Sequence, residues 1–220
     1  MPFIDRIDAG RKLARALARF KAQKPVVLAL PRGGVPVAAE IATALDAPLD
    51  LILVRKIGTP FQPELAMGAV VDGPAPLTVR NEDVILANGV SEREFNEVRD
   101  RELAEIVRRR ERYLGRRTRA ETRGRTAIVV DDGIATGATT RAALQAVQAR
   151  HPAMVVLAVP VAPTDVLAQL RSEADEVVCL EDHEDFGAIG YFYRNFDQVS
   201  DEEVIRLLAE HPAAPPAAAG

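Results

Sequence analysis

The chain has 220 residues, of which 48% are hydrophobic, and its formal net charge at pH 7 is −4. This length can bury one substantial core, and the small negative charge gives no overall field that attracts nucleic acid or membrane. No apolar run is long enough to span a bilayer, and the amino terminus lacks the pattern of a secretory signal. Cys179 is the only cysteine, so an internal disulfide is excluded and we expect a cytoplasmic protein.

Helical and strand patterns alternate from the beginning of the chain. Residues 8–22 have apolar side chains at helical spacing, with Asp8 as the expected N-cap. Residues 26–30 are an apolar strand pattern that ends at Pro31. An alanine-rich helix is expected to begin near Pro36, because proline is favoured in the first turn of a helix.

Three further strands are predicted in the next part of the chain. Residues 49–54 are apolar and predict a strand that ends at Arg55 and Lys56. Residues 68–71 and 77–80 predict two short strands on either side of a Gly-Pro turn.

A long charged segment then interrupts this alternation. Residues 91–115 predict one helix, in which Ser91 and Glu94 form a capping box and Gly115 provides a stop. Because this helix does not follow the strand–helix order of its neighbours, we interpret residues 81–123 as a helical insertion.

The stretch that follows carries the strongest functional signal. Residues 126–130 are apolar and mostly β-branched and predict a buried strand, which Asp131 and Asp132 follow directly. The loop after them leads into a helix, and such a loop can turn successive N–H groups toward one anion at the positive end of the helix dipole. The expected phosphate-binding residues are Gly133, Ile134, Ala135, Thr136, Gly137, Ala138, Thr139 and Thr140. A phosphate beside two carboxylates that accept hydroxyl groups matches ribose 5-phosphate.

Other phosphate loops do not fit this stretch, because no lysine follows Gly137 and the spacing G-x-G-x-x-G is absent. The alternative interpretation is an ordinary strand–turn–helix with a polar cap. Paired acids at the end of a strand repel each other when no ligand or metal is present, which favours a binding site.

After residue 140 the sequence again alternates between strand and helix patterns. Residues 154–161 and 176–180 predict strands, and residues 165–171 predict a short helix between them. Apolar strands that alternate with helices predict an α/β fold with a mostly parallel sheet covered on both faces, and ligands bind at the carboxyl ends of its strands. Residues 200–210 predict a last helix with a capping box, and the Pro/Ala-rich residues 211–220 are expected to be disordered.

A second loop, at residues 32–34, is also suited to binding an anion. Arg32, Gly33 and Gly34 lie between a predicted strand and a predicted helix, and the glycines let backbone amides approach an anion closely. Arg55 and Lys56 would bring two cations to the end of the next strand. The alternatives are a plain turn for the first group and a solvated strand end for the second.

Aromatic residues gather near the carboxyl end. Residues 186–196 contain five of the ten aromatic side chains of the chain, and Tyr191, Phe192 and Tyr193 are consecutive. These rings could stack on a planar ligand or form a small satellite core.

The stretch 128–139 resembles the 5-phosphoribosyl 1-pyrophosphate (PRPP) signature of the type I phosphoribosyltransferases: four apolar residues, two acids, a short loop and T-G-x-T. Residues 55–68 resemble a family of small bacterial phosphoribosyltransferase-like proteins. The resemblance covers residues 26–180. It implies the type I phosphoribosyltransferase fold in a single domain of residues 1–210, with a small hood formed by residues 181–210.

The resemblance also implies a function. The chain would be a pentosyltransferase of nucleotide metabolism that binds Mg²⁺–PRPP, transfers the ribose 5-phosphate group to a nitrogenous base and releases pyrophosphate. It implies a homodimer and a Mg²⁺ ion held mainly by substrate oxygens and water. Asp131 and Asp132 would be the catalytic residues, which hold the ribose hydroxyls near an oxocarbenium-like transition state.

The same resemblance assigns the other groups. The loop of residues 133–140 would hold the 5-phosphate, and the pyrophosphate would lie on Arg32, Gly33, Gly34, Arg55 and Lys56. The base would contact residues among Tyr191, Phe192 and Tyr193. The identity of the base does not follow from the sequence.

Two alternative functions remain open at this point. Residues 99–125 contain eleven arginines against five acids, so the chain could be a PRPP-sensing or nucleotide-sensing regulator that binds nucleic acid. The mixed charges and the lack of interleaved aromatic residues argue against nucleic acid. The other alternative is a hydrolase or phosphorylase that acts on ribosyl phosphates without PRPP.

Overall fold

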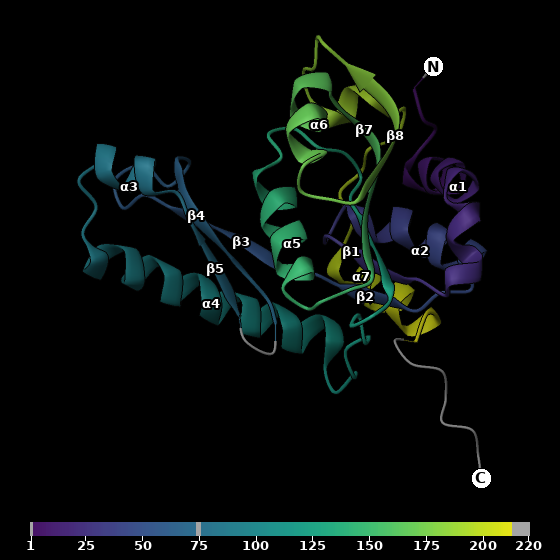
Figure 1. Cartoon of the computed structure of the whole chain (residues 1–220), viewed down its shortest axis with the longest axis horizontal. Coiled ribbons are helices and arrows are strands. Elements are labelled where there is room, and N and C mark those ends of the chain that lie inside the picture. The colour runs from purple at the N-terminus through teal and green to yellow at the C-terminus, as the bar shows by residue number, and fades with distance from the viewer. Residues whose placement is uncertain (1, 74–75, 213–220) are drawn as a thin grey trace.

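A parallel five-stranded sheet forms the centre of the protein (Figure 1). The computed structural model describes residues 2–73 and 76–212. The strands, in spatial order, are β2 (Leu49–Leu51), β1 (Val26–Ala29), β6 (Thr126–Val130), β7 (Met154–Pro163) and β8 (Glu176–His183). Every neighbouring pair is parallel. The predicted α/β fold with a mostly parallel sheet is confirmed.

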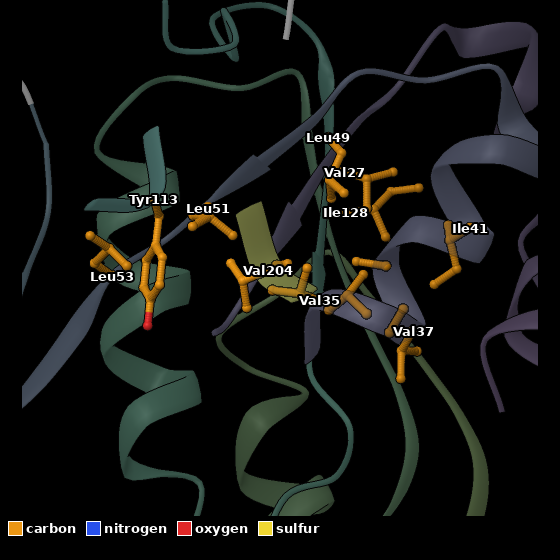
Figure 2. Close-up of a cluster of buried hydrophobic side chains, with 14 of the residues drawn as sticks. Val27, Val35, Val37, Ile41, Leu49, Leu51, Leu53, Tyr113, Ile128 and Val204 are labelled. Carbon is orange, nitrogen blue, oxygen red and sulfur yellow. The ribbon is translucent and has the colours of Figure 1, made fainter. Parts of the chain in front are cut away.

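Helices cover both faces of this sheet (Figure 1). One face carries α1 (Arg6–Ala16), α2 (Gly34–Leu45) and α7 (Asp201–Glu210), and the other carries α5 (Ala138–Gln148) and α6 (Thr164–Leu170). Successive strand residues point to opposite faces of the sheet. Val27 and Ile128 therefore belong to the core on the side of α1, α2 and α7, whereas Leu28 and Val129 belong to the core on the side of α5 and α6. Figure 2 shows Val27 and Ile128 with Ile41 of α2 and Val204 of α7.

The chain builds a second unit between β2 and β6. Its antiparallel sheet consists of β3 (Val54–Gly58), β4 (Ala66–Val71) and β5 (Leu77–Arg80), and two helices follow, α3 (Glu82–Ala87) and α4 (Glu92–Leu114). This unit projects to one side of the parallel sheet (Figure 1). The predicted long helix is confirmed with both of its ends, because Ser91 and Glu94 form a capping box and Gly115 follows the last turn.

Two sequence predictions about local structure are wrong: the N-cap and bounds of the first helix, and the capping box of the last helix. The first helix begins at Arg6 rather than Asp8, since the carboxylate of Asp5 accepts the bond from the N–H of Asp8. After Leu17 the chain tightens into a 3-10 turn, η1 (Ala18–Gln23), as helix ends often do. At the last helix, Ser200 accepts from the N–H of Glu203, but the reciprocal half of the predicted capping box is not among the described bonds.

The predicted strand of residues 49–54 is in fact two strands in two different sheets. The N–H of Ile52 still bonds Ala29 of β1, whereas the carbonyl of Leu53 accepts from Asp72 at the end of β4. Ile52 and Leu53 are both buried, so the apolar run continues through the point where the chain changes sheets. Hydrophobicity alone therefore could not reveal this break.

The two ends of the described chain pack against the core. Phe3 forms an isolated β-bridge with Tyr193. The N–H of Phe3 donates to the carbonyl of Phe192, and the N–H of Arg194 donates to the carbonyl of Phe3. The tail predicted to be disordered begins at His211, but Nε2 of this residue lies 2.8 Å from Oγ1 of Thr43 and its carbonyl accepts from Arg117. Residues 213–220 of that tail lie outside the described residues. No described helix is both long and apolar enough to cross a bilayer.

Candidate functional site

The two loops predicted to bind anions lie in direct contact at the carboxyl ends of β1 and β6. The N–H of Leu30 donates to the carbonyl of Val130 over 2.9 Å. A Cβ atom on Gly33 would lie 2.0 Å from Oδ2 of Asp132, and one on Gly34 would lie 2.7 Å from the carbonyl oxygen of Val130. Only glycine fits at these contacts, so the Arg32–Gly34 loop needs both glycines to lie against the acid pair.

The two carboxylates of the pair have different environments. Asp131 is half-buried, and its Oδ1 accepts from the N–H of Asp132 over 2.9 Å. Burial, together with the neighbouring Asp132 carboxylate, raises the pKa of Asp131 well above its usual value of 3.8. A bound cation or a hydroxyl donor would favour the charged form of this carboxyl group.

Asp132 is buried and already has partners within the protein. Its Oδ2 accepts from Nε of Arg6 over 2.7 Å, and its backbone carbonyl accepts from the hydroxyl of Tyr193 over 2.6 Å. Burial is also the main reason why the pKa of the Tyr193 phenol is raised. Arg6 and Gly33 both lie against the buried Asp132 carboxylate, whereas Asp131 is half-buried and is the more accessible acid.

The loop after the acids leads into α5 and leaves backbone donors available at the start of that helix. Gly137 has φ +74° and is the N-cap of α5, so no side-chain oxygen caps this helix from that position. The N–H of Arg141 makes the first bond of the helix, to the carbonyl of Gly137, which leaves the N–H groups of Ala138, Thr139 and Thr140 without helical partners. Thr139 is exposed and Thr140 is buried.

Not every residue of this loop can contribute its amide. The N–H of Ile134 donates to Val161 of β7 over 3.0 Å, and its side chain is buried. Gly133 lies against Ile189, because a Cβ at that position would approach Ile189 Cγ2 to 2.6 Å. Ala135 and Thr136 are exposed, so the open part of the loop runs from Ala135 to the first turn of α5.

A cavity of about 600 Å³ adjoins the outer side of this loop. Thr136, Ala138 and Arg141 contribute one wall, and Gly68 and Arg80 of the small sheet lie on the other. The cavity shows that ligand-sized space lies next to the first turn of α5.

Comparison with known proteins decides the family. Residues 4–195 match the family model described as "Phosphoribosyl transferase domain". The chain belongs to the phosphoribosyl transferase family. Its fold, a parallel sheet with helices on both faces, is the type I phosphoribosyltransferase fold that the sequence predicted.

Three individual relatives are similar over nearly the whole chain. Two curated proteins of Mycobacterium tuberculosis, "Putative phosphoribosyl transferase MT0597" of strain CDC 1551 and "Putative phosphoribosyl transferase Rv0571c" of strain H37Rv, are each 50% identical over 206 residues. These residues are 94% of this chain but 46% of each relative, so the chain spans about half the length of the curated relatives it matches. The crystal structure of TT1426 from Thermus thermophilus is 42% identical, has a TM-score of 0.83, and is matched over 96% of this chain and 100% of that one.

Two of the cations predicted for this site lie elsewhere. Arg55 and Lys56 are inside β3 of the small sheet rather than at the end of a parallel strand. Arg55 is paired with Glu102 and Lys56 with Glu64. Both line a cavity of about 670 Å³ between the small sheet and α4, which includes no residue of the two anion loops. The structure therefore does not bring them to the acid pair.

The three aromatic residues predicted to meet a base have different positions. Tyr193 is buried between Phe3 and Phe196, with ring centroids at 5.4 and 4.9 Å. Phe192 is half-buried and stacks on Phe186 at 4.9 Å, while Tyr191 is 79% exposed. Tyr191 and Phe192 belong to the short helix η2 (Ile189–Phe192), which lies over Gly133. Phe192 and Tyr193 therefore pack against other aromatic side chains, whereas the ring of Tyr191 is exposed.

The arginine-rich segment of residues 99–125 is largely paired within the protein. Arg108 and Arg109 contact Glu105, and Arg110 and Arg119 contact Asp72. Such pairing leaves fewer free cations for nucleic acid than the sequence implies. Within residues 2–73 and 76–212, no three His, Cys, Asp or Glu side chains gather into a group that could hold a metal ion.

Arg6 is the site residue that the sequence did not identify. It is 126 positions from its partner Asp132 and lies in an amphipathic helix with other arginines, so no local pattern marks it. The arginines of α4 were visible as a basic run, but only the structure places some of them beside Arg32.

Proposed function

We propose that this chain is a phosphoribosyltransferase that binds Mg²⁺–PRPP and transfers its ribose 5-phosphate group to a nitrogenous base, with release of pyrophosphate. The observation that carries the proposal is the contact between Gly33 and Asp132, which brings two anion loops and an acid pair together. PRPP has a phosphate, a vicinal diol and a pyrophosphate, and the two loops with the acid pair match these three groups.

Each group of PRPP has a proposed partner. The 5-phosphate would accept bonds from the free N–H groups at the start of α5 and from the hydroxyls of Thr136 and Thr139. The diol would donate to Asp131, the more accessible acid. The pyrophosphate would lie on the loop of Arg32, Gly33 and Gly34. Arg55 and Lys56 have no part in this arrangement, because they line a different cavity.

The donors of the site fit a Mg²⁺ ion held largely by its substrate. Mg²⁺ prefers oxygen ligands and keeps several waters, with one or two carboxylates and substrate phosphates completing its shell. Asp131 offers a half-buried carboxylate next to Gly34 of the proposed pyrophosphate loop. When bound, the ion would neutralise charge on the pyrophosphate leaving group.

The chain's own residues would act by position and charge. The reaction separates pyrophosphate from ribose C1, so positive charge develops on the ring as in other glycosyl transfers. Asp131 would lie near that charge and stabilise it more in the transition state than in the ground state. The 5-phosphate loop would hold the ribose in place while the bond breaks. We also propose a homodimer, which size-exclusion chromatography with light scattering would test.

The test of this proposal combines binding with product analysis. A ligand that binds only the native state raises its stability, by about 2.7 kcal/mol at 100 times the dissociation constant. We expect millimolar PRPP with Mg²⁺ to raise the melting temperature, and ribose 5-phosphate to do so less. A screen of bases for PRPP-dependent pyrophosphate release would then identify the acceptor. No thermal shift with PRPP would contradict the proposal, and ribose 5-phosphate formed without a base would favour a hydrolase.

A further inference from the structure

Two segments that are far apart in the sequence meet beside the acid pair. Residues 3–6 and residues 192–197 lie against each other, and we call them the terminal segments. The N–H of Phe3 donates to the carbonyl of Phe192, and the N–H of Arg194 donates to the carbonyl of Phe3, each over 2.8 Å. The terminal segments therefore form one hydrogen-bonded unit.

Arg6 connects this unit to Asp132. Its Nε donates to Oδ2 of Asp132 and its Nη1 donates to the carbonyl of Asp197, each over 2.7 Å. The guanidinium carbon also lies 3.8 Å from the ring centroid of Phe196. The side chain is 12% exposed, so it contacts the protein on nearly all sides. Arg6 therefore fixes the Asp132 carboxylate in one orientation, against Gly33.

Tyr193 holds the same acid by its backbone. The hydroxyl of Tyr193 donates to the carbonyl of Asp132 over 2.6 Å. The ring is itself fixed, because it packs between Phe3 and Phe196 with centroids at 5.4 and 4.9 Å. Burial raises the pKa of the phenol, so the hydroxyl keeps its proton and remains a donor at neutral pH.

The chain on either side of Asp132 is fixed as well. Before it, the carbonyl of Val130 accepts from the N–H of Leu30 over 2.9 Å. After it, the N–H of Ile134 donates to the carbonyl of Val161 over 3.0 Å. With its side chain, its carbonyl and both flanking segments held, Asp132 has an N–H group that points in a fixed direction.

This N–H group orients the neighbouring acid. It donates to Oδ1 of Asp131 over 2.9 Å. Within residues 2–73 and 76–212, no other hydrogen bond to the Asp131 carboxylate is present. A change in the Asp132 backbone would therefore remove this bond and let the Asp131 carboxylate rotate.

We propose that Arg6 and Tyr193 are positioning residues, which hold Asp132 so that its N–H directs the Asp131 carboxylate toward the ribose of the substrate. The inference rests on the proposed function in assigning the ribose to Asp131. Arg6 and Tyr193 bond Asp132, so their effect on the chemistry passes through Asp131. Displacing a reacting group by about 1 Å can lower a rate by about a hundredfold.

The first experiment uses Tyr193→Phe, which keeps the buried ring and removes one hydroxyl. In assays of pyrophosphate release at saturating PRPP, we expect kcat to fall about tenfold or more and KM for PRPP to change less than about threefold, because the lost interaction belongs to the transition state. The matched control is Thr126→Val at the opposite end of β6, which removes a buried hydroxyl that bonds Gln23 over 2.7 Å. Its kcat should stay within about twofold of the original, since no reacting group is displaced.

A second experiment separates positioning from a structural role. If Tyr193 acts through Asp131, then Asp131→Asn/Tyr193→Phe should have a kcat within about twofold of that of Asp131→Asn alone. A structural role would lower activity in both backgrounds alike. Arg6→Gln should show the same dependence on Asp131. Melting curves would verify that each variant is folded, and Tyr193→Phe carries the test if Arg6→Gln does not fold. Independent, additive losses of kcat in the folded variants would overturn the inference.

Crystal structures separate this inference from the proposed function. The Asp131 carboxylate should be displaced in Tyr193→Phe relative to the original chain. If the original chain releases no pyrophosphate with any base, the proposed function fails and the structures alone decide: a displaced carboxylate supports the positioning role, and an unmoved one overturns it. If the original chain is an active transferase and Tyr193→Phe keeps its full kcat, the proposed function stands and the inference is wrong.

Discussion

Nε of Arg6 lies 2.7 Å from Oδ2 of Asp132, although 126 positions separate the two residues in the sequence. The guanidinium of Arg6 also lies 3.8 Å from the ring centroid of Phe196 and donates to the carbonyl of Asp197. The side chains of Arg6 and Asp132 are only 12% and 11% exposed. The first helix therefore completes the enclosure of one acid of the pair, while the other acid remains accessible.

We expect Arg6→Gln to destabilise the protein at pH 7 by about 2 kcal/mol or more, because the Asp132 carboxylate would stay buried without its counter-ion. Urea denaturation would measure the change. The matched control is Arg11→Gln on the same helix, whose side chain is 65% exposed and pairs with Glu40. An exposed pair contributes at most about 1 kcal/mol. Equal losses in the two variants would show that the Arg6 pair is not the stronger one.

A double variant sharpens this prediction. In Arg6→Gln/Asp132→Asn the buried charge is removed together with its partner, so the loss should be smaller than the sum of the two single losses. The difference measures the coupling between the residues. Additive losses would mean that the two side chains do not interact energetically.

Gly33→Ala should impair ligand binding without unfolding the chain. A methyl group at this position would lie 2.0 Å from Oδ2 of Asp132, so either the loop or the acid must move. We expect the Kd for PRPP to rise by about tenfold or more, equivalent to a loss of ~1.4 kcal/mol. Gly187→Ala is the control, since its methyl group would meet only the ring of the exposed Tyr191. Equal binding by both variants would contradict the close fit of the loop.

The central loop shows how much of the site could be predicted from the sequence. Residues 126–140 are contiguous, so strand, acids, loop and helix could all be read in order, and the structure has the same elements there. The parallel sheet could be predicted for the same reason, because buried strands and their helices alternate along the chain.

What could not be predicted depends on contacts between distant parts of the chain. Arg55 and Lys56 follow an apolar run that changes sheets between two buried residues, and hydrophobicity gives no sign of such a change. Arg6 reaches Asp132 only through tertiary packing. Tyr193 was predicted with its two neighbours, yet its hydroxyl bonds the Asp132 carbonyl and its ring is enclosed.

The acid pair should reduce the stability of the empty protein at neutral pH. The folded-state pKa of Asp131 is raised above 3.8, so between the unfolded-state pKa and the folded-state pKa the folded protein holds a proton that the unfolded chain has released. Stability is then lost as pH rises above the unfolded pKa. Asp131→Asn cannot ionise, so it should be more stable than the original chain at pH 7, and the difference should shrink as pH falls toward 4. Chemical denaturation at several pH values would measure this, and a variant that is less stable at pH 7 would refute it.

The last prediction separates catalysis from binding, and it rests on the proposed transferase activity. Asp131 is half-buried beside the 5-phosphate loop, whereas Asp132 is enclosed by Arg6, Gly33 and Tyr193. If the charge of Asp131 stabilises an oxocarbenium-like transition state, Asp131→Asn should lower kcat by roughly a hundredfold or more, which corresponds to about 3 kcal/mol. Asp132→Asn should act mainly on stability and on KM for PRPP, because its carboxylate contacts the protein.

Thr139→Val provides the internal control for these kinetics. Thr139 is exposed in the first turn of α5, where its hydroxyl would meet the 5-phosphate, a group whose charge does not change during the reaction. We expect this variant to raise KM for PRPP and to change kcat less, since interactions equal in the ground and transition states do not alter kcat. Steady-state kinetics at saturating PRPP would compare the three variants. If both Asp variants keep full turnover, the acids are binding residues only, and the electrostatic role proposed for Asp131 is wrong.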